Sequence, residues 1–208
     1  MFNIIVKKYG DPDTLLFEKG DVQKLNHDSV RINVKSIGVN YADILLIKGK
    51  YQERPRPPFS PGLEISGIVS ETGSLAKTFK VGDRVMSIMK YGGYKTEVVI
   101  PQENTYFIPD GMDFIEAGGF PVVYGTAFSA LVTKAKIKKN EVCVILGATG
   151  GVGMAAIEIA KAYHATVIAC GGSEEKLKKC IKKGADYVLN YNNQIIRKEL
   201  KKIGVGEV

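Results

Sequence analysis

Closely spaced glycines follow a short apolar segment in the C-terminal half of the chain. The apolar segment, Val142–Leu146, is typical of a parallel strand that is buried on both faces. The glycines come directly after it: Gly147, Gly150, Gly151 and Gly153. Residues 154–163 then carry apolar side chains at helical spacing, and residues 166–170 form a second apolar segment. This order of strand, glycine turn, helix and strand predicts a βαβ unit.

The glycines of this turn have the types and spacing of a dinucleotide site. Gly147 permits a tight turn, and Gly150 and Gly151 allow the backbone to come close to a pyrophosphate. Gly153 lets the helix pack against the strand, so that the N–H groups of the first helical turn, which includes Val152, point at the anion. The alternative is an ordinary glycine-rich turn, but the flanking strands and helix favour dinucleotide binding.

The residues after the second strand bear on which dinucleotide is bound. A site for NAD usually has an Asp or Glu at the end of the second strand, about 20 residues after the glycine turn. This carboxylate binds the ribose 2′-hydroxyl. This chain has Gly171, Gly172 and Ser173 instead, followed by Lys176. A hydroxyl and a cation on the first turn of a helix suit the 2′-phosphate of NADPH. The sequence therefore favours NADPH.

Another interpretation of these residues leaves NADH open. Ser173 is also a good helix cap, Glu174 and Glu175 suit a first helical turn, and Lys176 would then be one solvated lysine among many. The two glutamates would weaken phosphate binding if they turned inward.

Length and composition are those of a globular protein with room for two domains. The chain has 208 residues, of which 45% are hydrophobic. The N-terminus lacks the long apolar core of a secretory signal, and no segment reaches the length of a membrane span, so we expect a cytoplasmic protein with no membrane partner. Cys143, Cys170 and Cys180 have neither C-x-x-C nor metal-ligand spacing, so we expect core thiols.

The net charge of +7 is concentrated in the second half of the chain. Residues 131–208 hold 14 Lys and Arg against 7 Asp and Glu, whereas residues 1–130 hold 15 of each. A polyanionic cofactor accounts for part of this excess, and a solvated helix surface for most of the rest. Nucleic-acid binding is unlikely on this composition, because no aromatic residues are interleaved with the charges and no known nucleic-acid motif occurs.

Short strands between glycine and proline turns dominate the first part of the chain. Val30, Ile32 and Val34 alternate with polar residues, as in a half-buried strand. We predict an α/β protein with a small, partly open β-barrel over residues 1–121 and a doubly wound parallel sheet over residues 122–208. Further expected strands cover residues 65–69, 97–100 and 187–189, and expected helices cover 40–48, 113–118, 122–134, 173–183 and a segment from about Gln194.

Six motifs carry a resemblance to a known family. They are residues 38–43 (GVNYAD), 48–51 (KGKY), 61–69 (PGLEISGIV), 81–85 (VGDRV), 124–127 (YGTA) and 147–153 (GATGGVG). In their order and spacing the chain resembles the medium-chain dehydrogenase/reductase superfamily, and within it the zinc-free quinone oxidoreductases related to zeta-crystallin. The resemblance implies a GroES-like N-terminal catalytic domain joined to a Rossmann NADPH-binding domain, with the active site in the cleft between them.

The resemblance also bears on metal binding. In the alcohol dehydrogenases of this superfamily, a cysteine stands at the position of Asn40 and a histidine at that of Leu63, and Gly118 lies near the place of a further cysteine. None of these residues can bind zinc, and no cysteine precedes Cys143 to form a structural zinc loop. Glu64 matches a family carboxylate, but one carboxylate does not make a site. We therefore expect no metal.

Four further site residues are implied by the resemblance. Asn40 matches the residue beside the nicotinamide that can donate a hydrogen bond to an acceptor carbonyl, and Tyr51 matches a pocket tyrosine. Thr126 matches a contact to the nicotinamide end of the cofactor, and Tyr191 matches a tyrosine that flanks the 2′-phosphate beside Ser173. The alternatives are a helix cap for Asn40, a half-buried aromatic for Tyr51 and helix packing for Thr126.

The resulting expectation is an oxidoreductase that transfers hydride from NADPH to a quinone or a related α,β-unsaturated carbonyl. An enone or acyl-thioester enoyl reductase on the same scaffold is an alternative, and so is a non-catalytic NADPH-binding module that touches RNA through its basic half.

Chains of this family continue beyond the point where this sequence ends, after residues 203–208. We therefore expect a truncated Rossmann domain with only the first half of its sheet, either because the chain is a fragment or because it is a shortened member. Taken alone, these residues are expected to bind NADPH weakly, to show little turnover and to self-associate through the bare sheet edge. The longer parent is expected to be a homo-oligomer.

Overall fold

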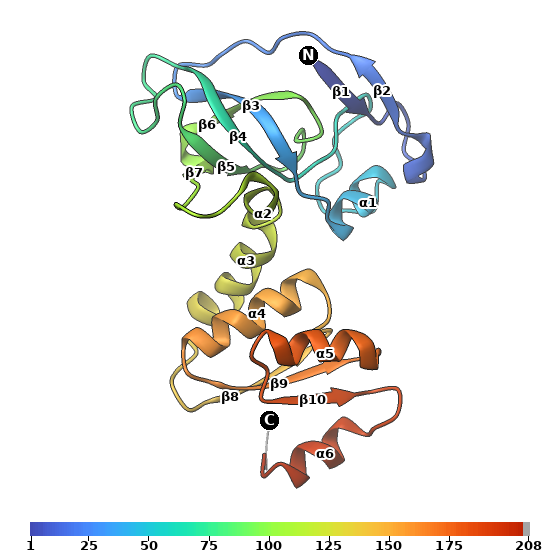
Figure 1. Ribbon diagram of the computed structural model, residues 1–208. Coiled ribbons are helices and arrows are strands. Elements are labelled where there is room, and N and C mark those ends of the chain that lie inside the picture. Colours follow the sequence, from blue (N-terminus) through green and yellow to red (C-terminus); the bar gives the residue numbers. More distant parts are fainter. Residues whose placement is uncertain (206–208) are drawn as a thin grey trace. The chain divides into compact units, whose positions relative to one another are not determined.

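The computed structural model describes residues 1–205, and they form two compact units. The first unit is Met1–Val122, and the second begins at Val123. Figure 1 shows the strands and helices of each unit in chain order. We describe each unit by itself.

The N-terminal unit is built on antiparallel strands. Its main sheet has the order β6-β3-β4-β5-β7, and β1 and β2 form a separate antiparallel pair. The strands are β1 (Phe2–Ile5), β2 (Leu16–Lys19), β3 (Ser29–Ile37), β4 (Glu64–Thr72), β5 (Arg84–Ile88), β6 (Glu97–Pro101) and β7 (Thr105–Phe107), with 3-10 turns at Pro12–Thr14 and Gln102–Asn104.

Alternation along β3 places one set of side chains in the core. Val30 and Ile32 are fully buried and pack with residues of β4, β5 and β6. Arg31, between them, points to the other face and pairs with Glu71 and Glu97 of the neighbouring strands. The alternation of buried and partly exposed side chains confirms the half-buried strand that was predicted from alternating apolar and polar residues.

The N-terminal unit has two short helices, α1 (Tyr41–Ile47) and α2 (Phe114–Gly118). The buried residues of α1, Leu46 and Ile47, pack with Val6 and Phe59, whereas α2 packs on β3 and β4. Each begins with a polar cap, Asn40 for α1 and Asp113 for α2. The Ser66 hydroxyl of β4 donates to the carbonyl oxygen of Phe114, which fixes α2 on β3 and β4. Both helices were predicted from the sequence within one residue at each end.

The second unit is a three-stranded parallel sheet between helices. Its strands, in the order β10-β9-β8, are β8 (Val142–Leu146), β9 (Thr166–Gly171) and β10 (Tyr187–Asn190). The helices are α3 (Pro121–Phe128), which begins at the boundary of the two units, α4 (Gly151–Ala162), α5 (Glu174–Lys182) and α6 (Ile196–Lys202).

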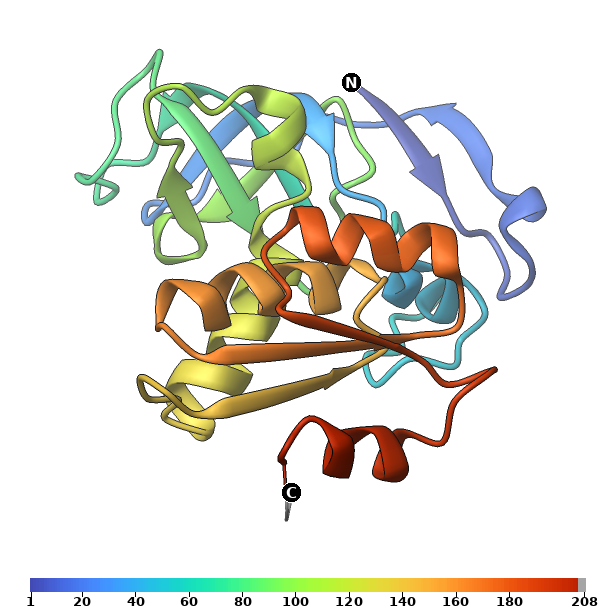
Figure 2. The ribbon, with the colours of Figure 1, turned by 60° about the horizontal axis from the view of Figure 1, so that its bottom comes forward.

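Helices cover both faces of this sheet. Figure 2 shows α4 and α5 on one face and α6 on the other. Val167 of β9 packs in the cluster beneath α4 and α5, whereas its neighbour Ile168 packs with Ile196 and Leu200 of α6. Because successive side chains of a strand point to opposite faces, a strand buried on both faces needs an uninterrupted apolar run. The run of β9 fits this arrangement. The run of β8, predicted to be buried on both faces, does not: of its five residues only Ile145 is buried, because β8 lies at the edge of the sheet.

Two helical segments differ from the expectation. The helix expected to continue to Lys134 changes at Ser129 to a π-helix, Ser129–Lys134, in which the Ala135 N–H donates to the Ala130 carbonyl. The last helix begins at Ile196 rather than near Gln194, because Gln194 closes the turn after β10: its side chain accepts from the Asn190 N–H.

Strand β8 lies at the edge of its sheet. Among residues 1–205 only β9 pairs with it, and its residues Val142 and Leu146 are 44% and 69% exposed. That this edge is bare, and that the chain self-associates through it, both stay predictions.

In the part of the chain that the structure describes, none of the helices combines the length and the apolar character that a membrane span requires.

Candidate functional site

The turn between β8 and α4 has the backbone geometry that its glycines predict. Gly147 has a φ of 66°, in the left-handed region that favours glycine. The Gly150 N–H donates back to the Gly147 carbonyl at 3.1 Å, and Gly150 then caps α4. The first turn of the helix contains Gly151, Val152 and Gly153. Its N–H groups have no partner within the helix, so they are available to an anion.

The glycines of the turn differ in what surrounds them. A Cβ on Gly153 would lie 2.6 Å from both the Ala148 Cα and the Gly147 carbonyl oxygen, so only glycine lets α4 pack this closely on the turn. Around Gly150 the nearest atom to such a Cβ would be 3.5 Å away, and around Gly151 the contact would be with the Val123 side chain. Gly153 therefore serves packing, whereas the backbone at Gly150 is open to the approach of a ligand.

The loops after β9 and β10 come together beside this turn. The Tyr191 N–H donates to the Gly171 carbonyl, and a Cβ on Gly172 would meet the Tyr191 ring at 2.9 Å. The Asn192 amide donates to the Gly172 carbonyl at 2.8 Å. The structure thus places Tyr191 against Gly172, the residue that precedes Ser173. In the sequence, Tyr191 and Ser173 are 18 residues apart.

Ser173 and Lys176 occupy the start of α5. The Ser173 hydroxyl accepts from the Lys176 N–H at 3.4 Å, so Ser173 is a helix cap, as its alternative interpretation holds. Capping uses an acceptor lone pair of the hydroxyl and leaves its proton available to a ligand. The Lys176 side chain is exposed, with no ion pair found for it within residues 1–205.

Asn190 organises this corner, a role that the sequence analysis missed. Its side-chain oxygen accepts from the Asn192 N–H at 3.0 Å, and its amide donates to Glu174. Asn190 is only 5% exposed. This bond engages one oxygen of the Glu174 carboxylate with the side chain of Asn190.

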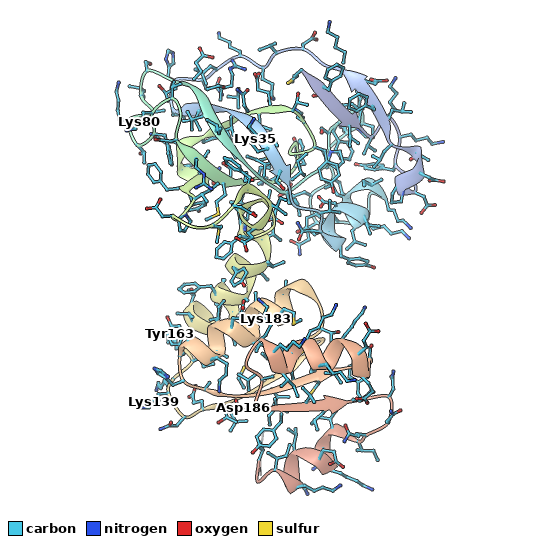
Figure 3. The ribbon with its side chains drawn as sticks, viewed as in Figure 1. Lys35, Lys80, Lys139, Tyr163, Lys183 and Asp186 are labelled. Atoms are coloured by element: carbon cyan, nitrogen blue, oxygen red, sulfur yellow. The ribbon has the colours of Figure 1, made fainter. Side chains whose placement is uncertain are left out.

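Helix α3 carries Thr126 and is fixed to the rest of the second unit. Tyr124 of α3 donates to the Glu158 carboxylate of α4, which also accepts from Lys183, labelled in Figure 3. Burial and the Glu158 charge raise the pKa of Tyr124 to about 12, so the phenol remains a donor across the physiological range. Thr126 is exposed two residues further along the same helix.

Asn40 is held by a buried carboxylate in the N-terminal unit. Its side-chain Nδ2 donates to Glu64 Oε1 at 2.8 Å, and the second oxygen, Oε2, accepts from the Val122 N–H at 2.8 Å. Glu64 is 1% exposed, and this burial raises the pKa of its carboxyl group. Asn40 also occupies the cap position of α1, so the helix-cap interpretation describes its backbone, while its amide group contacts Glu64.

A second buried carboxylate, that of Asp43, belongs to the first turn of α1, three residues after Asn40. Asp43 is 1% exposed; its Oδ2 accepts from the Asn40 N–H at 2.8 Å and from the Tyr94 hydroxyl at 3.3 Å. Burial raises the pKa of Asp43, and burial together with the Asp43 charge raises the pKa of Tyr94. Asp43 thus binds the backbone N–H of Asn40 and the hydroxyl of Tyr94 at the start of α1, whereas the side-chain amide of Asn40 donates to Glu64.

Tyr51 follows α1 and packs at the margin of an apolar cluster formed by Val6, Leu46, Ile47 and Phe59. It is partly buried, as the packing interpretation holds. Among the described residues, the side chain of Tyr51 packs against this apolar cluster, and its backbone carbonyl accepts a hydrogen bond from Arg54.

Two of the residues at the zinc positions of related enzymes have no side chain that could bind a metal. Leu63 is buried and apolar, and Gly118 lies against Ser36. Within residues 1–205 there is no group of three or more His, Cys, Asp or Glu side chains that could hold a metal ion.

Comparison with known families and structures agrees with this description. The sequence profile described as "Alcohol dehydrogenase GroES-like domain" matches residues 26–110, and that described as "Zinc-binding dehydrogenase" matches residues 151–207. Among curated relatives, quinone oxidoreductase-like protein 2 of Mus musculus is 39% identical over 84% of this chain, and the quinone oxidoreductase of Sus scrofa is 34% identical over all of it.

Solved structures show the same similarity. A probable oxidoreductase from Mycobacterium abscessus is 31% identical, with a TM-score of 0.92 over 100% of this chain and 67% of its own length. The Escherichia coli quinone oxidoreductase, whose structure is a complex with NADPH, is 31% identical, with a TM-score of 0.90 over 100% of this chain and 64% of its own.

A GroES-like unit followed by a Rossmann-like unit defines the medium-chain dehydrogenase/reductase superfamily, and this chain is a member of it. Within the superfamily, the chain belongs to the quinone oxidoreductase family. It spans 50% of the mouse relative and 63% of the pig relative.

Proposed function

We propose that the protein is an NADPH-dependent oxidoreductase that reduces a quinone or a related α,β-unsaturated carbonyl. The observation that carries the proposal is the pair of sites described above: an open glycine turn with a hydroxyl, a lysine and a tyrosine nearby, and a buried carboxylate that holds an amide donor. The quinone oxidoreductase relatives support the same acceptor class.

The residues of the second unit fit a dinucleotide. The open backbone at Gly150 and the N–H groups of the first turn of α4 suit a pyrophosphate. Ser173, Lys176 and Tyr191 supply a hydroxyl, a cation and an aromatic ring where a 2′-phosphate would lie, and no carboxylate ends β9. Thr126 is proposed to contact the nicotinamide end.

The residues of the N-terminal unit suit an acceptor carbonyl. NADPH, when bound, supplies the hydride. Asn40 has a second amide N–H besides the one given to Glu64, and we assign it the hydrogen bond to the acceptor oxygen, where negative charge develops. Tyr51 would stack on the flat ring or donate a second hydrogen bond. Because Asn40 and Leu63 offer no zinc ligands, we assign the protein acceptors that take hydride without a Lewis acid.

The cofactor assignment predicts a selective loss in the variant Lys176→Ala. A charge-assisted hydrogen bond contributes about 1.5–3 kcal/mol, so NADPH should bind roughly tenfold or more weakly while NADH is nearly unchanged. Calorimetric titration of both cofactors measures this. Lys178→Ala, which removes an exposed lysine from the same helix, is the matched control. Equal losses for both cofactors in Lys176→Ala would remove Lys176 from the 2′-phosphate site.

The reaction itself is tested by NADPH oxidation with a panel of quinones, enones and acyl-thioester enoyl compounds. The proposal predicts that the protein oxidises NADPH faster than the protein-free control, and that quinones give the highest rate. The absolute rate with residues 1–208 alone is expected to be low. Preference for an enoyl thioester would support the enoyl reductase alternative on the same scaffold. Tight NADPH binding with no oxidation by any member would support a non-catalytic NADPH-binding module, and RNA binding by the basic half would then be tested separately.

A further inference from the structure

Glu64 is a carboxylate that the proposed chemistry does not itself use, yet it is among the most deeply buried side chains of the N-terminal unit. It begins β4, and both of its oxygens accept hydrogen bonds from N–H groups, one from the Asn40 side chain and one from the Val122 backbone. A buried carboxylate is costly unless it is fully paired. Here each oxygen has a hydrogen-bond donor, and the two bonds connect the carboxylate to two specific partners.

The Asn40 partner gains a defined orientation from this contact. The oxygen and nitrogen of an asparagine amide have nearly the same shape, so an isolated side chain can turn either way. A carboxylate whose oxygens both accept hydrogen bonds admits only the nitrogen. Glu64 therefore fixes which end of the Asn40 amide faces it, and with that the direction of the remaining N–H.

The Val122 partner holds the carboxylate in place. Helix α3 begins at Pro121, so the Val122 N–H belongs to the first helical turn, whose donors have no partner within the helix. The negative charge of Glu64 also suits the helix N-terminus. Gly38 makes the space for it, since a Cβ there would lie 2.2 Å from Glu64 Oε1 and 2.4 Å from the Gly118 carbonyl oxygen.

We propose that Glu64 is a positioning residue for Asn40: clamped between the start of α3 and Asn40, its carboxylate sets the orientation in which the amide donates to the acceptor. The inference rests on the proposed function for the role of Asn40 as donor. The orientation of the amide by Glu64 can be measured without any turnover.

The structural arm of the test follows the Asn40 side-chain amide by NMR. In the unaltered chain, the hydrogen-bonded amide proton should exchange slowly with solvent and resonate apart from its geminal partner. In Glu64→Leu, which has no acceptor, this protection should be lost, and in Glu64→Gln, which retains the shape, it should be reduced. Glu71→Gln makes the same change further along β4 and should leave the Asn40 signals unchanged. Unchanged Asn40 protection in a folded Glu64→Leu chain would overturn the proposal; if that variant does not fold, unchanged protection in Glu64→Gln would do so.

The kinetic arm is a double-mutant cycle. Glu64→Gln should lower kcat for quinone reduction roughly tenfold while the affinity for NADPH stays the same, as expected for a residue that orients another. Because Glu64 acts through Asn40, adding Glu64→Gln to Asn40→Ala should cost little more than Asn40→Ala alone. Fully additive losses would overturn the positioning role. If the unaltered chain reduces no acceptor, the proposed function fails, and the NMR arm still decides the orientation.

Discussion

Replacing Gly153 by alanine should abolish measurable binding of NADPH and NADH alike. The added methyl group would lie 2.6 Å from two backbone atoms of the turn, which cannot move aside as a flexible side chain can. Overpacking of this kind costs about 1–3 kcal/mol of stability, and here it would displace the segment that we propose holds the pyrophosphate. Thermal unfolding and calorimetric titration measure the two effects, and both should be present.

Gly150→Ala is the matched variant for this prediction. Its methyl group has 3.5 Å to the nearest atom, so the melting temperature should stay close to that of the unaltered chain. Both cofactors should nevertheless bind more weakly, because the methyl group occupies the side from which a pyrophosphate would approach. If Gly150→Ala bound both cofactors normally, the turn would not be the pyrophosphate site, whatever Gly153→Ala did.

Asn40→Ala should lower kcat for quinone reduction roughly 100-fold, the loss typical of removing one donor to a developing oxyanion. KM for the quinone should change little, because the hydrogen bond strengthens mainly as charge develops. Steady-state kinetics at saturating NADPH measure both constants. NADPH affinity should be unaffected, because the proposed cofactor contacts lie in the second unit.

Asn40→Asp separates the donor from the helix cap. Aspartate caps a helix as well as asparagine does, but it has no N–H, and it would place a second carboxylate against Glu64. It should therefore lose as much kcat as Asn40→Ala. Asn33→Ala, at an exposed position of β3, should keep the full rate. A rate near normal in Asn40→Asp would show that only the cap matters.

The sequence predicted the features whose cause is local. The glycine turn, the caps at Asn40 and Ser173 and the apolar runs of β8 and β9 each depend on residues within a few positions of one another. The alternation along β3 is equally local. These parts of the fold, and the backbone of the proposed dinucleotide site, could be predicted without knowing what packs against them.

The contacts that complete the site depend on register and topology, which local patterns do not contain. Glu64 is 24 residues from Asn40 and 58 from Val122, and only the fold of the N-terminal unit brings the three together. Asn190 likewise meets Glu174 only because β9 and β10 are parallel neighbours. A polar residue directly after the strand predicted at residues 187–189 was the signal that could have indicated Asn190.

The selectivity of the second unit for a 2′-phosphate is tested most directly by titrating the unaltered chain with NADPH, with NADH and with the adenosine half of each cofactor. If Ser173, Lys176 and Tyr191 surround the phosphate, NADPH should bind more tightly than NADH, and the adenosine half that carries the 2′-phosphate should retain the same preference over the one that lacks it. Equal affinity for the two cofactors, or tighter binding of NADH, would contradict the assignment.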